Sequence, residues 1–284
     1  MRDFDPRLTP ARADLAAKEL EGKVAAARYV GGSNYEVIAP QAPLRLEPTP
    51  DAPLATEALK GERVAIYETN GEGWAWGQLA ADHYVGWLPT NALASPGPPP
   101  THKVSALRTF VFPVPSIKTP PLEALPFGAR LAIARIEDRF AVTPSGGHVP
   151  AVHLMPAERN ERDFVAVAER FLGAPYLWGG KTMLGLDCSG LVQIALSACG
   201  TSCPRDTDMQ ECVLGAPVAA GDLADLQRGD LVFWKGHVAI ARDRATLIHA
   251  NAFHMAVAIE PIADALGRIR GTGSATTGVR RIAR

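Results

Sequence analysis

The chain has 284 residues, of which 47% are apolar and 21% are charged, and its formal net charge is −1. This length suits two domains, or three small ones, and the composition is that of a globular protein with packed cores. The balanced charge gives no basic surface for nucleic acid and no strong field toward a membrane, so we expect neither as a partner.

Residues 1–35 are expected to form a helical segment ahead of the first domain. Thr9 would cap a short helix, Pro10 would open it, Leu15 would face inward and Gly22 would end it. The N-terminus holds no apolar stretch of signal-peptide length, and no segment reaches the run of about 20 apolar residues that a membrane-spanning helix needs. We therefore expect a cytoplasmic protein.

Residues 36–95 change character, because short apolar runs alternate with Pro, Gly and Asn-Gly turns. This spacing predicts a small all-β barrel. Its strands are expected at residues 36–38, 63–67, 74–79 and 84–88. The order of Leu59-Lys60-Gly61, Gly73-Trp74-Ala75-Trp76 and Val85-Gly86-Trp87 resembles bacterial SH3-like domains, which commonly bind or position cell-wall peptides.

A Pro-rich linker at residues 95–100 leads to a second β-rich stretch at residues 102–156. Strands are expected there at residues 109–112, 130–136 and 139–143. This stretch resembles a second, more divergent SH3-like barrel.

From residue 160 the apolar period becomes helical. Apolar residues follow one helix face from Phe164 to Leu172, and Gly173 should end that helix. A second helix is expected from Cys188 to about Cys199. Strands are expected at residues 230–234, 237–242, 246–250 and 257–260. Helices followed by a sheet predict an α+β domain over residues 160–284.

Cys188 lies where a glycine-rich approach meets the second helix, between Asp187 and Ser189-Gly190. Unpaired amides and the helix dipole at such a position favour a thiolate, so we expect Cys188 to be the most reactive cysteine. Asp187 has a simpler interpretation as the helix N-cap. The other cysteines (Cys199, Cys203 and Cys212) include no Cys-x-x-Cys pair, and we expect no metal site and no cofactor.

Two histidines are spaced to assist a thiol nucleophile. His237 opens one expected strand and His249 lies near the end of the next, with the turn near residues 243–245. Antiparallel pairing would place them nearly opposite each other on one face, with Cβ atoms about 5 Å apart. Cys188 would then be the nucleophile, His237 the general base and His249 the group that orients it. Half-exposed strand residues or metal ligands are the alternatives for the pair.

These motifs together resemble the NlpC/p60 family of papain-like cysteine peptidases, which act on bacterial cell-wall peptides. The resemblance covers roughly residues 160–283 and keeps the order of the family's motifs. It rests on Pro175-Tyr-Leu-Trp-Gly-Gly180, Leu186-Asp-Cys-Ser-Gly-Leu-Val-Gln193, Pro204-Arg-Asp-Thr207, Gly229-Asp-Leu-Val-Phe-Trp234, His237-Val-Ala-Ile240 and Ile248-His-Ala250. The implied fold is a papain-like α+β catalytic domain preceded by two SH3-like barrels.

The whole layout resembles the γ-D-glutamyl-L-diamino acid endopeptidases of murein-peptide recycling. That resemblance implies cleavage of L-Ala-γ-D-Glu-diamino acid peptides with a free N-terminal alanine, where the diamino acid is diaminopimelate or lysine. It also implies substrate-binding roles for Tyr176 near the oxyanion, Asp187 and Ser189 at the substrate amine and backbone, Arg205 and Asp206 in the same cleft, and Glu47 and Tyr84 from the first barrel. A cationic amine suits a partly buried carboxylate.

Two other functions remain open at this point. A papain-like amidase, transamidase or acyltransferase would use the same three residues with another acyl acceptor. A non-catalytic protein would bind cell-wall peptide through its barrels, although an intact Cys-His-His set favours an enzyme.

Overall fold

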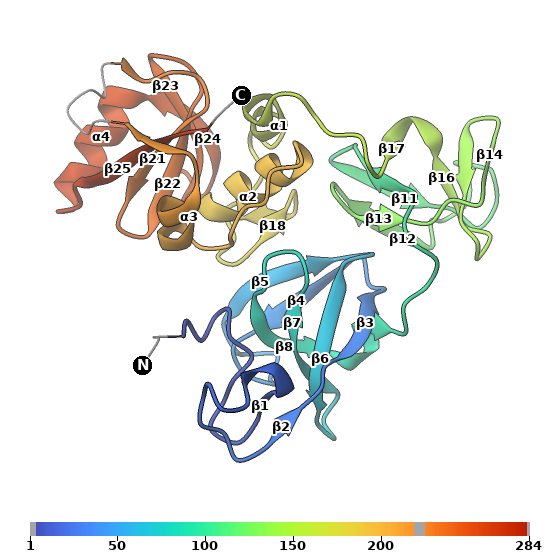
Figure 1. The fold of residues 1–284 in the computed structure, drawn as a ribbon. Coiled ribbons are helices and arrows are strands. Elements are labelled where there is room, and N and C mark those ends of the chain that lie inside the picture. The colour runs from blue at the N-terminus through green and yellow to red at the C-terminus, as the bar shows by residue number, and fades with distance from the viewer. Residues whose placement is uncertain (1–3, 219–224, 283–284) are drawn as a thin grey trace. The chain divides into compact units, whose positions relative to one another are not determined.

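The computed structural model describes residues 4–218 and 225–282. The chain divides into two units, Met1–Arg159 and Asn160–Arg284. The first unit is built mainly of strands, and the second combines α-helices with a sheet, so the protein is of the α+β class (Figure 1). Among the described residues, no helix is long and apolar enough to cross a membrane.

The first SH3-like region is a seven-stranded sheet in the order β5-β4-β8-β7-β6-β3-β9. Its elements are β3 (Ser33–Val37), β4 (Gln41–Arg45), β5 (Leu54–Leu59), β6 (Arg63–Thr69), β7 (Trp74–Leu79), β8 (Val85–Pro89), the 3-10 turn η2 (Thr90–Ala92) and β9 (Leu93–Ala94). The four expected strands are present. β4 and β5 are not among the strands predicted from the sequence. In β4, Pro43 interrupts the apolar run. Gly86 allows β8 to approach β4, where a Cβ would lie 2.2 Å from the Leu44 side chain.

The prediction of a helix near residues 10–22 is wrong. The segment forms β1 (Ala16–Ala17), which pairs in parallel with β2 (Tyr29–Val30), and a 3-10 turn η1 (Lys18–Leu20). Leu15 is fully buried in a cluster with Trp76 and Trp87 of the barrel. The Arg12 guanidinium lies 4.4 Å from the Trp76 ring centroid. Burial against the barrel therefore outweighs the local helix signal.

Residues 102–156 form three small sheets instead of one continuous sheet, in the orders β13-β10-β17, β11-β12 and β14-β15-β16. The elements are β10 (His102–Val104), β11 (Arg108–Val111), β12 (Glu123–Pro126), β13 (Arg130–Leu131), β14 (Arg135–Glu137), β15 (Phe140–Val142), β16 (His148–Pro150), η3 (Ala151–His153) and β17 (Leu154–Pro156). The single strand expected at residues 130–136 is thus two strands. A common core that includes Val104, Leu125 and Val149 joins the sheets.

The second unit contains a six-stranded antiparallel sheet in the order β20-β25-β21-β22-β23-β24. Its strands are β20 (Ala216–Val218), β21 (Asp230–Trp234), β22 (His237–Ala241), β23 (Thr246–Asn251), β24 (Ala256–Pro261) and β25 (Thr276–Arg281). The four strands expected from sequence are confirmed to within one residue at each end.

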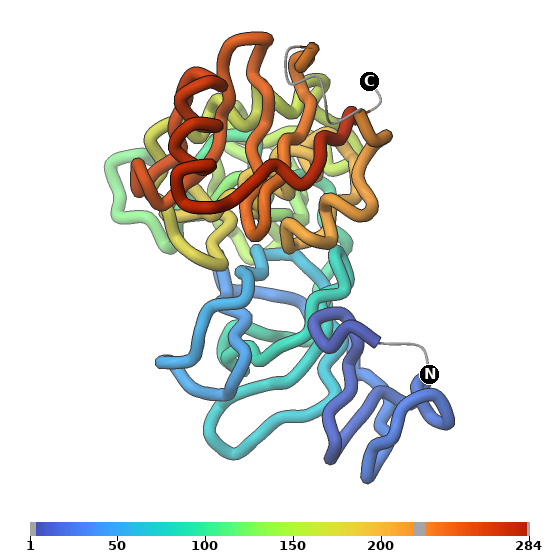
Figure 2. The backbone as a smooth tube through the Cα atoms, turned by 90° about the vertical axis from the view of Figure 1, so that its left-hand side faces the viewer, coloured from blue at the N-terminus to red at the C-terminus, as the bar shows by residue number. Residues whose placement is uncertain are grey.

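Helices and a small hairpin complete this unit: α1 (Phe164–Glu169), β18 (Lys181–Thr182), β19 (Gly185–Leu186), α2 (Cys188–Ala198), α3 (Thr207–Val213) and α4 (Ile262–Gly271). The helix expected from Cys188 is confirmed. The first helix is shorter than expected, because it gives way after Glu169 to i→i+3 turns that end at Gly173 with φ of 83°. α2 packs on β22 and β23, and α4 on β23 and β24. Figure 2 shows α4 in red alongside the sheet.

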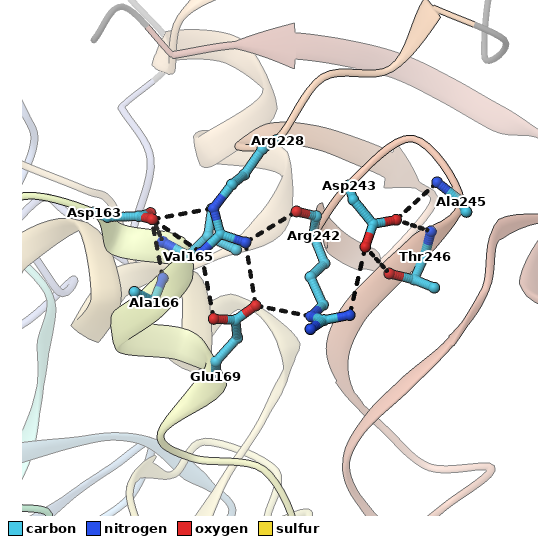
Figure 3. Close-up of polar contacts among 9 residues, drawn as sticks. All are labelled: Asp163, Val165, Ala166, Glu169, Arg228, Arg242, Asp243, Ala245 and Thr246. Atoms are coloured by element: carbon cyan, nitrogen blue, oxygen red, sulfur yellow. Dashed lines mark hydrogen bonds and ion pairs between the residues drawn. The ribbon is translucent and has the colours of Figure 1, made fainter.

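An ion-pair network fixes the hairpin of β22 and β23 to α1 (Figure 3). Arg228 pairs with Asp163 at 2.9 Å and with Glu169 at 3.1 Å, and Arg242 at the end of β22 pairs with Glu169 at 2.8 Å. Asp243 accepts hydrogen bonds at 2.8 Å from two amides of the turn that follows. The network therefore holds the turn between the two strands that carry His237 and His249.

Candidate active site

Cys188 opens α2, and Asp187 is its N-cap. The Asp187 Oδ1 atom accepts the Gly190 amide at 2.7 Å. Gly190 has to be a glycine, because a Cβ there would lie 2.4 Å from the Gly180 carbonyl oxygen. The helix start is thus held closely against the glycine turn that precedes it. A hydrogen bond from the Val238 amide to the thiol places the Cys188 sulfur beside the residue that follows His237.

The structure brings His237 and His249 together, with His237 Nε2 2.8 Å from His249 Nδ1. The pairing differs from the expected register, because Ile240 pairs with Ile248. Extending that register places Ala239, not His237, opposite His249. The two histidines are therefore diagonal neighbours two residues apart, and a shift of two keeps both side chains on one face.

Glu260 is a site residue that the sequence reasoning missed. His249 Nε2 lies 2.7 Å from Glu260 Oε1, and both side chains are buried. His249 pairs with Ala258 of β24, so residue 260 projects from the same face. The alternation of side chains along the strand expected at residues 257–260 is the sequence signal for this placement. The sequence alone assigns Glu260 no role beyond the end of that strand.

The Cys188 thiol and the His237 imidazole are both neutral at neutral pH. Burial raises the pKa of Cys188 to about 12, and the Asp187 charge acts in the same direction. Burial, followed by His249 and Arg268, lowers the pKa of His237 to about 3. The expectation that the helix start favours a resting thiolate is therefore wrong, because loss of hydration outweighs the helix terminus.

Asp187 and Ser189 belong to a buried network around Arg205. The Arg205 guanidinium, 1% exposed, donates to Asp187 Oδ1 at 2.9 Å, to Asp187 Oδ2 at 2.7 Å and to Ser189 Oγ at 2.8 Å. The Gly179 amide and the Ser189 hydroxyl also donate to Asp187, at 2.8 and 3.2 Å. With the Gly190 amide, these groups make five hydrogen bonds to a carboxylate that has about four acceptor positions. Asp187 therefore anchors Arg205 and leaves no acceptor position for a substrate amine.

Tyr176 and Asp206 lie at the same end of the unit. Burial, followed by the charges of Cys188 and Asp187, raises the pKa of Tyr176 to about 12, so its phenol remains a donor. Asp206 is half-buried at the N-terminus of α3, directly after Arg205, and its side chain does not cap that helix. Burial alone would lower the pKa of Arg205, but Asp187 and Asp206 raise it above its ordinary value.

The remaining sequence candidates lie in the first unit. Tyr84 is 5% exposed in the barrel core with Val37 and Leu44, so its side chain has a structural role. Its contact with substrate stays a prediction. Glu47 is exposed in the connection between β4 and β5.

The other cysteines are dispersed. Cys203 is buried, Cys199 is partly buried and Cys212 is exposed. Within residues 4–218 and 225–282, no group of three or more His, Cys, Asp or Glu side chains could hold a metal ion.

Nucleophilic catalysis by a thiol needs a base and a group that orients the base, and the second unit supplies them from three neighbouring elements. In its fold and in this set of side chains, the second unit resembles cysteine peptidases as a class. Residues 173–268 match the model of the NlpC/P60 family, and residues 44–93 match the model described as bacterial dipeptidyl-peptidase Sh3 domain. The second unit therefore carries an NlpC/P60 domain over residues 173–268, as the motifs predicted.

Similar proteins agree with this assignment. Dipeptidyl-peptidase 6 of Lysinibacillus sphaericus is 35% identical over 101 residues, which are 36% of this chain and 36% of that protein. Gamma-D-glutamyl-L-lysine dipeptidyl-peptidase of Bacillus cereus is 26% identical over 74% of this chain and 71% of that protein. The chain spans 36% of the length of the Lysinibacillus protein and 48% of a probable endopeptidase of Corynebacterium glutamicum that is 40% identical over 36% of this chain.

Solved structures share the fold. An NlpC/P60 family protein from Bacillus cereus superposes with a TM-score of 0.74 at 22% identity, covering 89% of this chain and 100% of that chain. An NlpC/P60 endopeptidase from Photobacterium damselae superposes with a TM-score of 0.62 at 15% identity, over 87% of this chain and 71% of that chain.

Proposed function

We propose that the protein is a cysteine endopeptidase that hydrolyses the γ-D-glutamyl–diamino acid bond of short murein peptides with a free N-terminal L-alanine. The observation that carries the proposal is the hydrogen bond between His237 and His249 beside the Cys188 helix, within the part of the chain that matches the NlpC/P60 family. The names of the Bacillus relatives support a γ-D-glutamyl-lysine bond as the first substrate to examine.

The mechanism begins with neutral partners. His237 uses Nδ1, the nitrogen not engaged with His249, to take the Cys188 proton as the sulfur attacks the γ-carbonyl carbon of D-glutamate. Amides at the start of α2 and the Tyr176 hydroxyl would stabilise the oxyanion. His237 then returns the proton to the departing amine, which leaves a thioester on Cys188. Water, deprotonated by His237, attacks the thioester and releases L-Ala-D-Glu, with its γ-carboxyl group free, and the Cys188 thiol.

We assign recognition of the substrate amine to Asp206 instead of Asp187. Asp187 already accepts from five donors, whereas Asp206 begins α3 next to Arg205 and is only half-buried. An ammonium group near a partly buried carboxylate gains a charge-assisted hydrogen bond. An acylated amine would lose that interaction, so the free N-terminus would determine which peptides are cleaved.

Three further features belong to the proposal. Residues 102–156, with short strands around one apolar core, would be a degenerate second SH3-like barrel. The protein would act in the cytoplasm, and its role would be the recycling of murein peptides. Fractionation of cells that express the chain with an epitope tag tests the location, since recovery outside the cytoplasm would contradict it.

A substrate panel tests the activity. The purified chain is incubated with L-Ala-γ-D-Glu-L-Lys, with the diaminopimelate analogue and with N-acetylated forms of both, and products are identified by mass spectrometry. Release of L-Ala-D-Glu from the free peptides alone supports the proposal. Transfer of the acyl group to an added amine in preference to water would instead indicate a transamidase, and no cleavage of any peptide would overturn the peptidase assignment.

A further inference from the structure

We propose that Glu260 is a positioning residue that fixes the direction of the protons along His249 and His237, and that Arg268 keeps it in that role. The inference rests on the proposed thiol chemistry, but the proton arrangement exists without substrate and can be measured separately.

The four side chains form one continuous array. Glu260 Oε1 lies 2.7 Å from His249 Nε2, and His249 Nδ1 lies 2.8 Å from His237 Nε2. Arg268 of α4 pairs with Glu260, and its guanidinium lies 4.4 Å from the centroid of the Phe253 ring. The Glu260 side chain is 9% exposed. Strands β22, β23 and β24 supply His237, His249 and Glu260 in the order of their pairing, and α4 supplies Arg268.

The chemistry of these groups determines which atom carries each proton. An ionised carboxylate only accepts, so His249 Nε2 must donate to Glu260. A neutral imidazole has one donor and one acceptor, so His249 Nδ1 is an acceptor. His237 Nε2 therefore donates to it, and His237 Nδ1 holds the lone pair that takes the thiol proton. Without Glu260 the opposite arrangement becomes available, in which His237 Nδ1 carries a hydrogen and cannot act as the base.

Arg268 has a distinct part in this arrangement. Burial favours the neutral form of Glu260, but the hydrogen bond and the electrostatic interaction with His249, followed by the charge of Arg268, lower the pKa of Glu260 overall. Arg268 also balances the charge of the Glu260 carboxylate. A protonated His249 would donate from both nitrogens and would reverse the hydrogen bond to His237. The Glu260–Arg268 pair therefore fixes which nitrogen atoms of His249 and His237 carry protons, and it adds little net charge.

The direct test is nitrogen-15 NMR of the histidine side chains in the whole chain at about pH 8, where an ordinary imidazole is neutral. We expect wild-type His249 to be protonated at Nε2 and His237 at Nε2, with His237 Nδ1 unprotonated. Assignments come from His237→Asn and His249→Asn. A wild-type His237 protonated at Nδ1 would overturn the inference, whether or not the murein peptide is cleaved.

Variants test the cause. In Glu260→Gln the side-chain amide can accept from or donate to His249, so we expect a mixture of His237 protonation sites and a loss of kcat of about 10- to 100-fold with KM unchanged. Arg268→Met should show the same mixture, and Arg268→Lys should restore the wild-type spectrum. Wild-type protonation sites in both Glu260→Gln and Arg268→Met would overturn the inference.

Glu169→Gln is the matched control. Glu169 is another carboxylate held by arginines in the same unit, but it lies outside the histidine array. The Glu169→Gln variant should have a lower melting temperature than the wild type, with an unchanged histidine NMR spectrum and an unchanged kcat. If Glu169→Gln changed both as strongly as Glu260→Gln does, the role of Glu260 would be merely structural and the inference would fail.

Discussion

The guanidinium of Arg205 lies 2.7 Å from the carboxylate of Asp187, one residue before the nucleophile, and both side chains are buried. The ion pair connects the start of α2 to the chain just before α3, 18 residues away. The Arg205–Asp187 ion pair lies next to Cys188 in the chain. Neither side chain takes part in the proposed proton transfer from Cys188 to His237.

Removing Arg205 should destabilise the protein severely. Arg205→Met leaves the Asp187 carboxylate buried without its counter-ion, and breaking a buried pair in this way costs about 3–5 kcal/mol. Urea denaturation of the wild type and the variant gives the difference in the free energy of unfolding. The double variant Asp187→Asn/Arg205→Met removes both charges and should recover part of the loss. A loss below about 1 kcal/mol in the single variant would contradict this account of the network.

Replacing Asp206 should change KM, whereas replacing Asp187 should change the free energy of unfolding. Asp206→Asn should raise KM for L-Ala-γ-D-Glu-L-Lys by about tenfold or more with a small effect on stability, because it removes a charge-assisted hydrogen bond to the substrate amine. Asp187→Asn should chiefly lower the free energy of unfolding. Steady-state kinetics and urea denaturation on both variants separate the two roles, and an unchanged KM in Asp206→Asn would refute the amine assignment.

Alkylation should show that Cys188 is not a resting thiolate. With a pKa of about 12, its rate with a small neutral alkylating reagent should rise about tenfold per pH unit from pH 6 to pH 9 without a plateau. Exposed Cys212 should react faster at neutral pH, contrary to the expectation from sequence. Peptide mapping by mass spectrometry distinguishes the cysteines, and Cys212→Ser is the control. A plateau for Cys188 near neutral pH would mean that a thiolate is already present.

The pKa of His237 predicts a loss of stability in acid. It is lowered from 6.5 to about 3, so between these values the unfolded chain binds a proton that the folded protein excludes. This contribution is fully present above about pH 6.5 and falls by at most about 1.4 kcal/mol per pH unit toward pH 3. Urea denaturation from pH 7 to pH 4 should show a shallower decline for His237→Asn than for the wild type. Parallel declines would contradict the assigned pKa.

The nucleophile and its base could be predicted because local rules determine them. A capped helix start places Cys188, and alternation along β22 and β23 places His237 and His249 on one face even though the register differs by two residues. Glu260 could not be assigned a role in the same way, because its role depends on the neighbouring strand and on the protons of His249.

Contacts distant in sequence account for the remaining differences. Asp187 was expected to meet a substrate amine, but Arg205 reaches it from the chain before α3. The helix signal near Leu15 was overridden by burial against Trp76 and Trp87. A thiol at a helix N-terminus suggested a thiolate, whereas the degree of burial that raises its pKa follows from packing that the sequence does not display.

The central claim is that Cys188 cleaves the γ-D-glutamyl bond of a free murein peptide. The most direct test compares the purified wild type with Cys188→Ala on L-Ala-γ-D-Glu-L-Lys and follows free lysine by mass spectrometry. We expect lysine and L-Ala-D-Glu in equal amounts from the wild type and neither from the variant. Equal release by both proteins, or none by the wild type, would contradict it.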